Sequence, residues 1–189
     1  MVHTNNTDFL KLQDEARNIA EEVRNNFAGL SKEELNWKPN PKSWSIAQCL
    51  EHLINSNRCY FPTFEEIILG EKKRRFLERI PFVSDFWGKL FIKSLSPESE
   101  RKLKSPKLFM PTTSDIDNTI ISQFSDNQGR LIGFIQATSC LDMKHTFITS
   151  PATRFVTYSL HNAYEIILQH ERRHLSQALR VLKMNSFAR

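Results

Sequence analysis

Glycine is scarce in this sequence, with only 5 among 189 residues. Turn-rich β architectures use many glycines, because tight turns need backbone conformations that other residues rarely adopt. Long hydrophobic runs are also missing, and no apolar stretch approaches the roughly 18 residues of a membrane-spanning helix. These two shortages disfavour a β sandwich or barrel and an integral membrane protein, and they favour helices.

Cysteine is scarce too, and its number is odd. Cys49, Cys59 and Cys140 form no Cys-x-x-Cys pair. The first residues, MVHTNNTDF, lack the apolar segment of a secretion signal. We therefore expect free thiols and a cytoplasmic setting, where thiols stay reduced.

Charge is plentiful but only mildly unbalanced, at +5 overall. The excess of basic residues lies at 72–79 and 101–107. Such clusters attract nucleic acid or anionic surfaces weakly, but no nucleic-acid-binding motif accompanies them. We interpret them as solvated residues, and we expect neither a nucleic-acid partner nor a membrane partner.

Four long segments of the sequence have the period of an amphipathic helix. Apolar residues recur there every three or four positions, which places them on one helical face. The predicted helices span residues 7–30, 45–70, 114–138 and 157–183. Pro62 predicts a kink in the second helix, and Gly70 predicts its end. Gly129 and Gly133, one turn apart on the third helix, would let a neighbouring helix approach closely.

These segments predict an all-α fold, a four-helix bundle. A chain of this length fits a single domain over residues 1–189. The connection 71–112 contains the aromatic stretch RIPFVSDFWGKLFIKSL, for which we expect an extra short helix. Trp37 and Trp44 flank a proline turn, and we expect them to pack at the start of the second helix. Ser45 is placed to cap the first turn of that helix.

The stretch HERRH, at 170–174, fits the pattern H-E-x-x-H. On a helix this pattern presents two zinc-binding histidines around a glutamate that acts as a base. His170 and His174 are one turn apart and lie on the predicted apolar face. Two imidazoles in this arrangement can bind one metal ion, whereas two unligated histidines in a core would be hard to satisfy.

A metalloprotease of this type takes a third ligand further along the chain. No His, Asp, Glu or Cys follows His174, so the usual protease arrangement fails. We interpret Glu171 as an ordinary solvent-facing residue beside Arg172 and Arg173. The pattern therefore predicts a metal site of another kind.

The third ligand has to come from upstream, and His52 is the best candidate. It lies at the edge of the apolar face of the second helix, and a bundle can direct it toward a pair on another helix. Three protein nitrogens leave a position open for water or substrate, as in catalytic metal sites. We therefore predict that His52, His170 and His174 bind a metal ion, and we assign no catalytic residue.

Three other side chains are weaker candidates for the site. His145 could act as a fourth ligand or a proton shuttle, although we interpret it as a surface histidine. Cys59 could be a soft ligand, although a buried structural cysteine is commoner. Gln177 lies one turn beyond His174 and could hydrogen-bond to a ligand.

Two blocks of the sequence resemble the DinB/YfiT-like bundle proteins, also called DinB-like metal-dependent hydrolases. The blocks are LNWKPNPKSWSIAQCLEHL at 35–53 and AYEIILQHERRHLSQALRVL at 163–182. The resemblance implies a four-helix bundle with a divalent metal, nickel or zinc, on three histidines that match His52, His170 and His174, and with water completing the shell. It also implies a small-molecule substrate, in some relatives a low-molecular-weight thiol that is joined to an electrophile, and a homodimer.

The function stays open between three hypotheses. The first is a metal-dependent enzyme on small molecules, which activates a thiol for S-transfer or water for hydrolysis. The second is a metal-binding or stress-associated bundle without catalysis. The third is a metal-free interaction module that uses the basic residues at 72–79 and the aromatic stretch after them.

Overall fold

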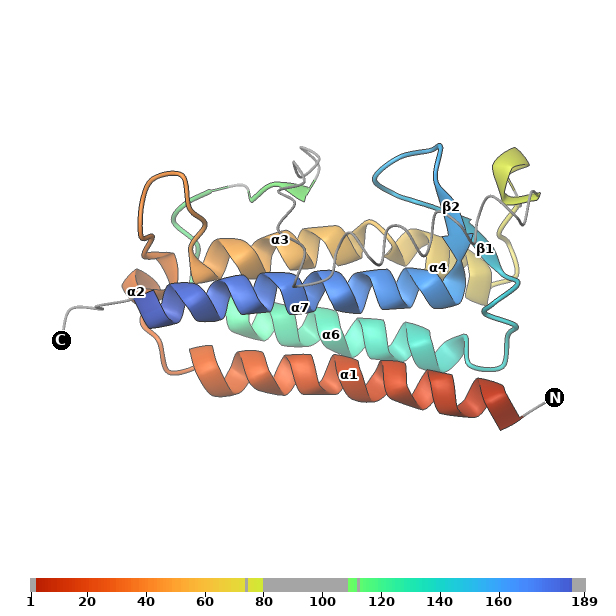
Figure 1. Ribbon diagram of the computed structural model, residues 1–189, viewed down its shortest axis with the longest axis horizontal. Helices are drawn as coiled ribbons and strands as arrows, with labels where there is room; N and C mark the ends of the chain where they lie inside the picture. The colour runs from red at the N-terminus through yellow and green to blue at the C-terminus, as the bar shows by residue number, and fades with distance from the viewer. Residues whose placement is uncertain (1–2, 74, 80–108, 112, 185–189) are drawn as a thin grey trace.

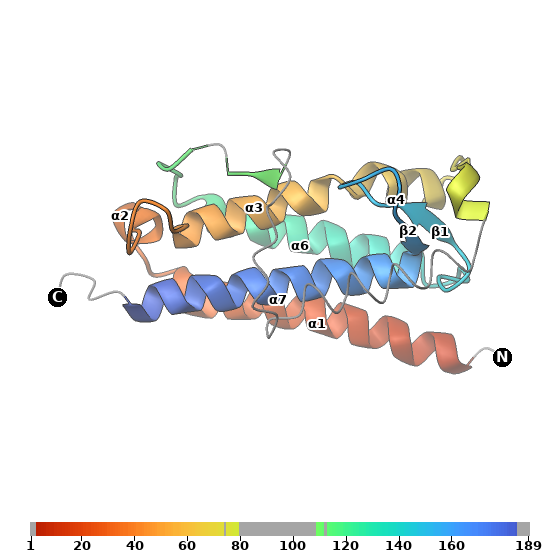
Figure 2. The same cartoon turned by 45° about the horizontal axis from the view of Figure 1, so that its top comes forward.

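Four long helices lie side by side in the computed structural model (Figure 1 and Figure 2). The structure describes residues 3–73, 75–79, 109–111 and 113–184. The long helices are α1 (His3–Phe27), α3 (Ile46–Arg58), α6 (Ile120–Ala137) and α7 (Leu160–Met184). They confirm the predicted all-α bundle. No helix among the described residues is both long and apolar enough to cross a membrane.

The helices follow one another around the bundle in the order α1, α6, α3, α7, and α7 closes the ring against α1. Figure 1 shows that α3 and α6 run in one direction and that α1 and α7 run in the other. The chain between α3 and α6 therefore connects opposite ends of the bundle. The apolar stripes meet inside, where Ile19, Phe27, Leu53, Phe124 and Leu131 are fully buried.

The second predicted helix is two helices in the structure. Ser45 caps α3, and its side chain and that of Gln48 satisfy each other's backbone N–H groups. Helix α3 ends at Arg58, and a second helix, α4 (Phe61–Ile68), begins three residues later. Pro62 lies in the first turn of α4, where a missing N–H costs nothing. Gly70 ends this segment with a φ of 71°, as predicted.

The third helix begins six residues later than predicted, at Ile120. The residues before it use their polar groups in local bonds: the Thr113 hydroxyl accepts from the Asp115 N–H, and the Asp117 carboxylate accepts from the Thr119 N–H. Such side-chain bonds compete with a helix. The predicted close approach at Gly129 and Gly133 is wrong, because both face solvent with no atom near the position of a Cβ.

One short helix and two short strands were not predicted. Helix α2 (Lys32–Asn36) lies between the first two predicted helices, just before the proline turn, and begins with a Ser31–Glu34 capping box. Strands β1 (Phe147–Thr149) and β2 (Thr157–Ser159) form an antiparallel pair where a loop and the start of the fourth helix were expected. Their β-branched and aromatic residues suit a strand. They displace the start of α7 to Leu160.

The connection after α4 contains the 3₁₀ helix η1 (Phe76–Arg79). The buried side chain of Glu78 holds η1 in place. The Glu78 carboxylate accepts hydrogen bonds from the Lys72 ammonium at 2.6 Å, the Arg75 N–H at 3.0 Å and the Thr149 hydroxyl at 2.8 Å. These bonds join η1 to β1 at one end of the bundle (Figure 1). The expected extra helix in the aromatic stretch falls outside the described residues.

Candidate metal centre

The structure brings the three predicted ligands together. His52 comes from α3, and His170 and His174 come from successive turns of the adjacent helix α7. One ring nitrogen from each lies within 4.8 Å of the other two. The ring centroids are 4.5–4.9 Å apart. Among the described residues this is the one such cluster of potential metal ligands.

His52 is held in the form that a metal requires. Its Nδ1 lies 2.6 Å from the carbonyl oxygen of Phe109. A carbonyl only accepts hydrogen bonds, so Nδ1 carries the proton. The lone pair of the neutral ring then lies on Nε2, which faces the other two histidines.

The hydrogen bond of His170 indicates the opposite tautomer of the imidazole ring. Its Nε2 lies 3.1 Å from the Nε2 of His52. One of the two nitrogens must donate this hydrogen bond, and the His52 nitrogen already acts as the acceptor. This contact, as a hydrogen bond, places the proton of His170 on Nε2, and a metal bound through this atom would require that proton on Nδ1.

His174 has a side-chain partner of its own. Its Nδ1 lies 3.1 Å from the Oε1 of Gln177, which confirms the proximity expected from their spacing. The amide oxygen accepts the Nδ1 proton and leaves Nε2 as the free lone pair of the ring. Two of the three imidazoles are thus orientated by a hydrogen bond to an oxygen acceptor.

Burial keeps the cluster neutral. It lowers the pKa of His52, lowers that of His170 well below the usual range, and lowers that of His174 to about 3. Positive charge on one ring would disfavour charge on the next, which lowers the pKa of His170 and of His174 further. Neutral imidazole is the form that binds metals, so the site is set for binding at neutral pH.

An aromatic wall lies against the cluster. The indole of Trp44 stacks on the His174 ring, with centroids 5.5 Å apart and planes 23° apart. The same indole contacts the His52 ring at 4.8 Å and 56°. Trp44 packs at the start of α3 as expected, but its contact with the ligands was not predicted. The only sequence signal was its place next to the cap of the helix that carries His52.

The interpretation of Glu171 as a solvent-facing residue is wrong. Its side chain is fully buried, and its Oε1 accepts hydrogen bonds from the side-chain amides of Asn57, at 2.7 Å, and Gln128. Burial raises the pKa of the carboxyl to about 7. The neighbouring Arg172 instead points to α1, where it pairs with Glu15 and Glu22. The face of α7 next to the histidines therefore packs in the core, although the charged sequence HERRH does not indicate this.

The weaker candidates lie outside the cluster. His145 is exposed, and its Nδ1 is 2.8 Å from the Asp142 carboxylate. Cys59 is half-buried, and its thiol donates to the Asn55 carbonyl at 3.2 Å. Neither belongs to the group of converging ligand atoms.

The three imidazoles fit a transition metal. With metal–nitrogen bonds of about 2.0–2.1 Å, the nitrogens of a tetrahedral site lie roughly 3.4 Å apart. The His52 and His170 nitrogens are already 3.1 Å apart, and the ligand nitrogen of His174 lies within 4.8 Å of both. A set of imidazoles suits zinc, nickel, copper or iron, whereas calcium and magnesium prefer oxygen ligands.

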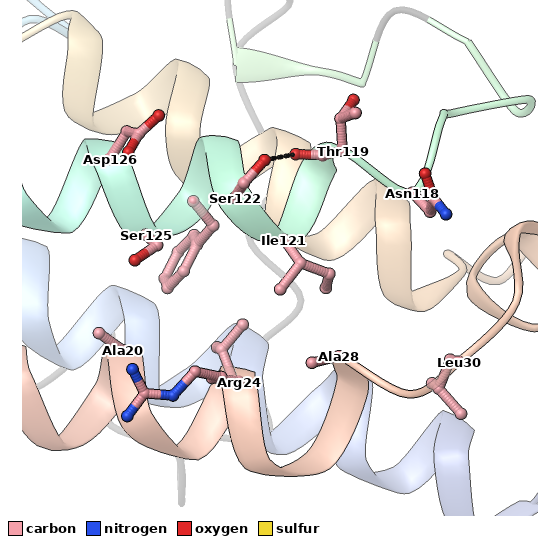
Figure 3. A pocket seen from close by; sticks show the side chains of 12 residues that line it. Ala20, Arg24, Ala28, Leu30, Asn118, Thr119, Ile121, Ser122, Ser125 and Asp126 are labelled. Atoms are coloured by element: carbon pink, nitrogen blue, oxygen red, sulfur yellow. Dashed lines mark hydrogen bonds between the residues drawn. The ribbon is translucent and has the colours of Figure 1, made fainter.

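A surface pocket of about 470 Å³ lies elsewhere, between α1 and α6 (Figure 3). Its charged lining residues are Arg24 and Asp126, and the Ser122 hydroxyl within it donates to the Thr119 carbonyl at 2.8 Å. None of the three histidines lines it. The converging nitrogens, and not this pocket, therefore identify the candidate site.

The sequence profile of the DinB superfamily matches residues 14–178, which include all three histidines of the cluster. The chain belongs to the DinB superfamily. This membership confirms the resemblance found in the two sequence blocks, and the cluster is compatible with metal binding. No curated protein and no solved structure matches this DinB-superfamily chain.

Proposed function

We propose that this protein is a metal-dependent enzyme that acts on a small molecule at the cluster of His52, His170 and His174. The convergence of three neutral imidazole nitrogens carries the proposal. Three protein ligands leave a coordination position for water or substrate, the pattern of catalytic sites. Nickel or zinc is the proposed metal, since both accept imidazole ligands.

A bound nickel or zinc ion would lower the pKa of a coordinated thiol or water and so supply a nucleophile at neutral pH. The protein's own part is to hold the ligands. The Phe109 carbonyl and the Gln177 amide set the tautomers of His52 and His174. Trp44 stacks on the His174 ring and contacts the His52 ring at an angle.

We propose a low-molecular-weight thiol as the nucleophile and an organic electrophile as the acceptor, with hydrolysis by water as the alternative. The resemblance to relatives that transfer thiols supports the first reaction. In that reaction the sulfur forms a bond to carbon, and the leaving group departs with the electron pair. A homodimer is part of the proposal on the same ground, and light scattering on the purified protein tests it.

Elemental analysis of tag-free protein tests the metal site. We expect close to one nickel or zinc ion per chain in the wild type, and none in a His52→Ala/His174→Ala double variant. A His145→Ala/His161→Ala variant is the matched control, because it removes two histidines outside the cluster and should keep the metal. Absence of metal from the wild type, even after dialysis against zinc or nickel, would refute the proposal.

A screen with one electrophile, in the presence and absence of thiols, tests the reaction. Thiol transfer yields a thioether only when thiol is present, whereas hydrolysis yields the hydroxyl product in either case. We expect metal-dependent thioether formation that the double variant lacks. Hydroxyl product alone would reassign the enzyme as a hydrolase.

Binding of metal without catalysis is the second candidate function. Glu171 favours it, because the one carboxylate of the HERRH motif is engaged by Asn57 and Gln128 inside the core. In this case the wild type would contain metal but would convert no electrophile with any thiol or with water.

A further inference from the structure

Trp44 contacts two of the three candidate ligands, yet it belongs to neither of their helices. It lies in the turn before α3, and its half-buried indole reaches both His52 and His174. The two contacts differ in geometry, because the indole is nearly parallel to the His174 ring, at 23°, and inclined to the His52 ring, at 56°. A single rigid side chain thus contacts ligands from α3 and from α7.

The backbone next to Trp44 is fixed on several sides. Ser45 is fully buried, its N–H donates to Gln48 Oε1 at 3.2 Å, and its hydroxyl accepts from the Gln48 N–H at 3.1 Å. The Gln48 amide also donates to the Thr113 carbonyl at 3.1 Å. These bonds hold the backbone from which the indole extends.

The stacked geometry leaves the metal-binding atom of His174 free. A metal bound to an imidazole nitrogen lies in the plane of the ring, whereas a stacked indole covers the face of the ring. Trp44 therefore does not occupy the metal position. It does oppose rotation of the His174 ring out of its present plane, because rotation would drive the imidazole into the indole.

Each of these two histidines then has two restraints. His52 has the Phe109 carbonyl at Nδ1 and the indole against its ring, and His174 has the Gln177 amide at Nδ1 and the indole against its face. A hydrogen bond at one ring nitrogen sets the tautomer but still allows the ring to tilt about that bond. Contact with the ring removes this freedom. Partners of this kind orient metal ligands and raise metal affinity.

We infer that Trp44 is a positioning residue of the metal centre, which holds the His52 and His174 rings so that their Nε2 atoms converge on one ion. The inference rests on the proposed three-histidine metal site. It predicts that the indole contributes to metal affinity and to the coordination geometry, although it donates no ligand atom. Loss of the indole should loosen the site without unfolding the bundle.

Cobalt(II) binding tests this role, because the visible spectrum of the ion reports its coordination geometry. We expect Trp44→Ala to weaken cobalt binding by about 10- to 100-fold, as removal of an orienting partner does in other metal sites, and to change the spectrum. Trp44→Phe should recover most of the affinity, since a phenyl ring still covers the imidazoles. Trp37→Ala is the matched control, because it removes an indole that packs on the core from the other end of the same turn.

Thermal unfolding of the metal-free variants separates a local effect from a global one. Trp44→Ala and Trp37→Ala should lower the melting temperature comparably, while only the first weakens cobalt binding. If Trp44→Ala binds cobalt as tightly as Trp37→Ala does and with the wild-type spectrum, Trp44 only packs and the inference is wrong. If the wild type binds no cobalt, the metal site itself is wrong, and the role of Trp44 fails with it.

Discussion

The hydrogen-bond partners of the histidines indicate where each ring carries its proton. Neutral His52 carries its proton on Nδ1, opposite the Phe109 carbonyl, and His170 carries its proton on Nε2, opposite His52. One ligand is thus ready for a metal, whereas another has to shift its proton first. This hydrogen bond gives the Nε2 atoms of His52 and His170 a partner in each other.

Nitrogen-15 NMR of the imidazole rings tests this assignment. In the metal-free protein we expect the proton of His52 on Nδ1 and that of His170 on Nε2. Addition of zinc should move the His170 proton to Nδ1 and leave that of His52 unchanged, because the Phe109 carbonyl already fixes it. A metal-free His52 with its proton on Nε2 would contradict the assignment.

The buried carboxyl of Glu171 leads to a second prediction, which concerns how the free energy of unfolding depends on pH. Burial raises its pKa to about 7 in the folded protein, above the ordinary value of 4.5 that the unfolded chain would show. Its stabilising contribution is therefore present below about pH 4.5 and is lost as the pH rises through 7. Relative to Glu171→Gln, which stays neutral and still offers an oxygen acceptor to Asn57 and Gln128, the wild type should lose about 2.5 kcal/mol between pH 5 and pH 8.

Urea unfolding of both proteins at several pH values measures this difference. The comparison between wild type and variant removes the contribution of other titrating groups that the two proteins share. A difference in the free energy of unfolding that does not change with pH would show that the Glu171 carboxyl titrates normally.

At the scale of elements, the chain before α6 is attached to α2 and α3 by side chains that reach its backbone. Asn36 accepts from the Ile116 N–H at 2.9 Å and donates to the Ile116 carbonyl at 2.6 Å. Gln48 donates to the Thr113 carbonyl, and His52 donates to that of Phe109. One of these side chains is His52, a candidate metal ligand. The position of the segment before α6 and the tautomer of His52 therefore depend on each other.

Asn36→Ala removes two of these attachments. We expect faster hydrogen exchange at the Ile116 amide and a loss of about 1–3 kcal/mol in the free energy of unfolding, because a buried backbone pair loses its partner. Asn26→Ala is a suitable control, since the exposed Asn26 amide donates to the Glu22 carbonyl within its own helix. Unchanged exchange at Ile116 would show that Asn36 does not hold this chain.

The helices were predictable because apolar residues at intervals of three and four reveal a buried face from local sequence alone. The histidine pair was predictable for the same reason, since the four-residue spacing of His170 and His174 fixes their common face. The position of Glu171 was not predictable, because its partners, Asn57 and Gln128, lie far away in the chain. The β1–β2 pair depends likewise on a contact across a loop, which helical periodicity does not encode.

At the scale of the whole molecule, metal binding and folding are coupled. The cluster joins α3 to α7, and the unfolded chain cannot hold its three histidines together. Free zinc at a hundred times its dissociation constant should add about 2.7 kcal/mol to the stability of the folded state. For a protein of this size the melting temperature should then rise by roughly 5–10 °C.

Calorimetry with and without zinc measures this shift. The His145→Ala/His161→Ala variant should show the same rise as the wild type, whereas His52→Ala/His174→Ala should show none. An equal rise in all three proteins would mean that zinc binds elsewhere on the chain.

X-ray absorption spectroscopy of the zinc- or nickel-loaded protein tests the central claim most directly. We predict a first shell of nitrogen and oxygen at about 2.0–2.1 Å, and outer-shell scattering that requires three imidazoles. In His52→Ala one imidazole should be lost from the fit. A shell with sulfur, or one with a single imidazole that does not change in His52→Ala, would contradict the three-histidine metal centre.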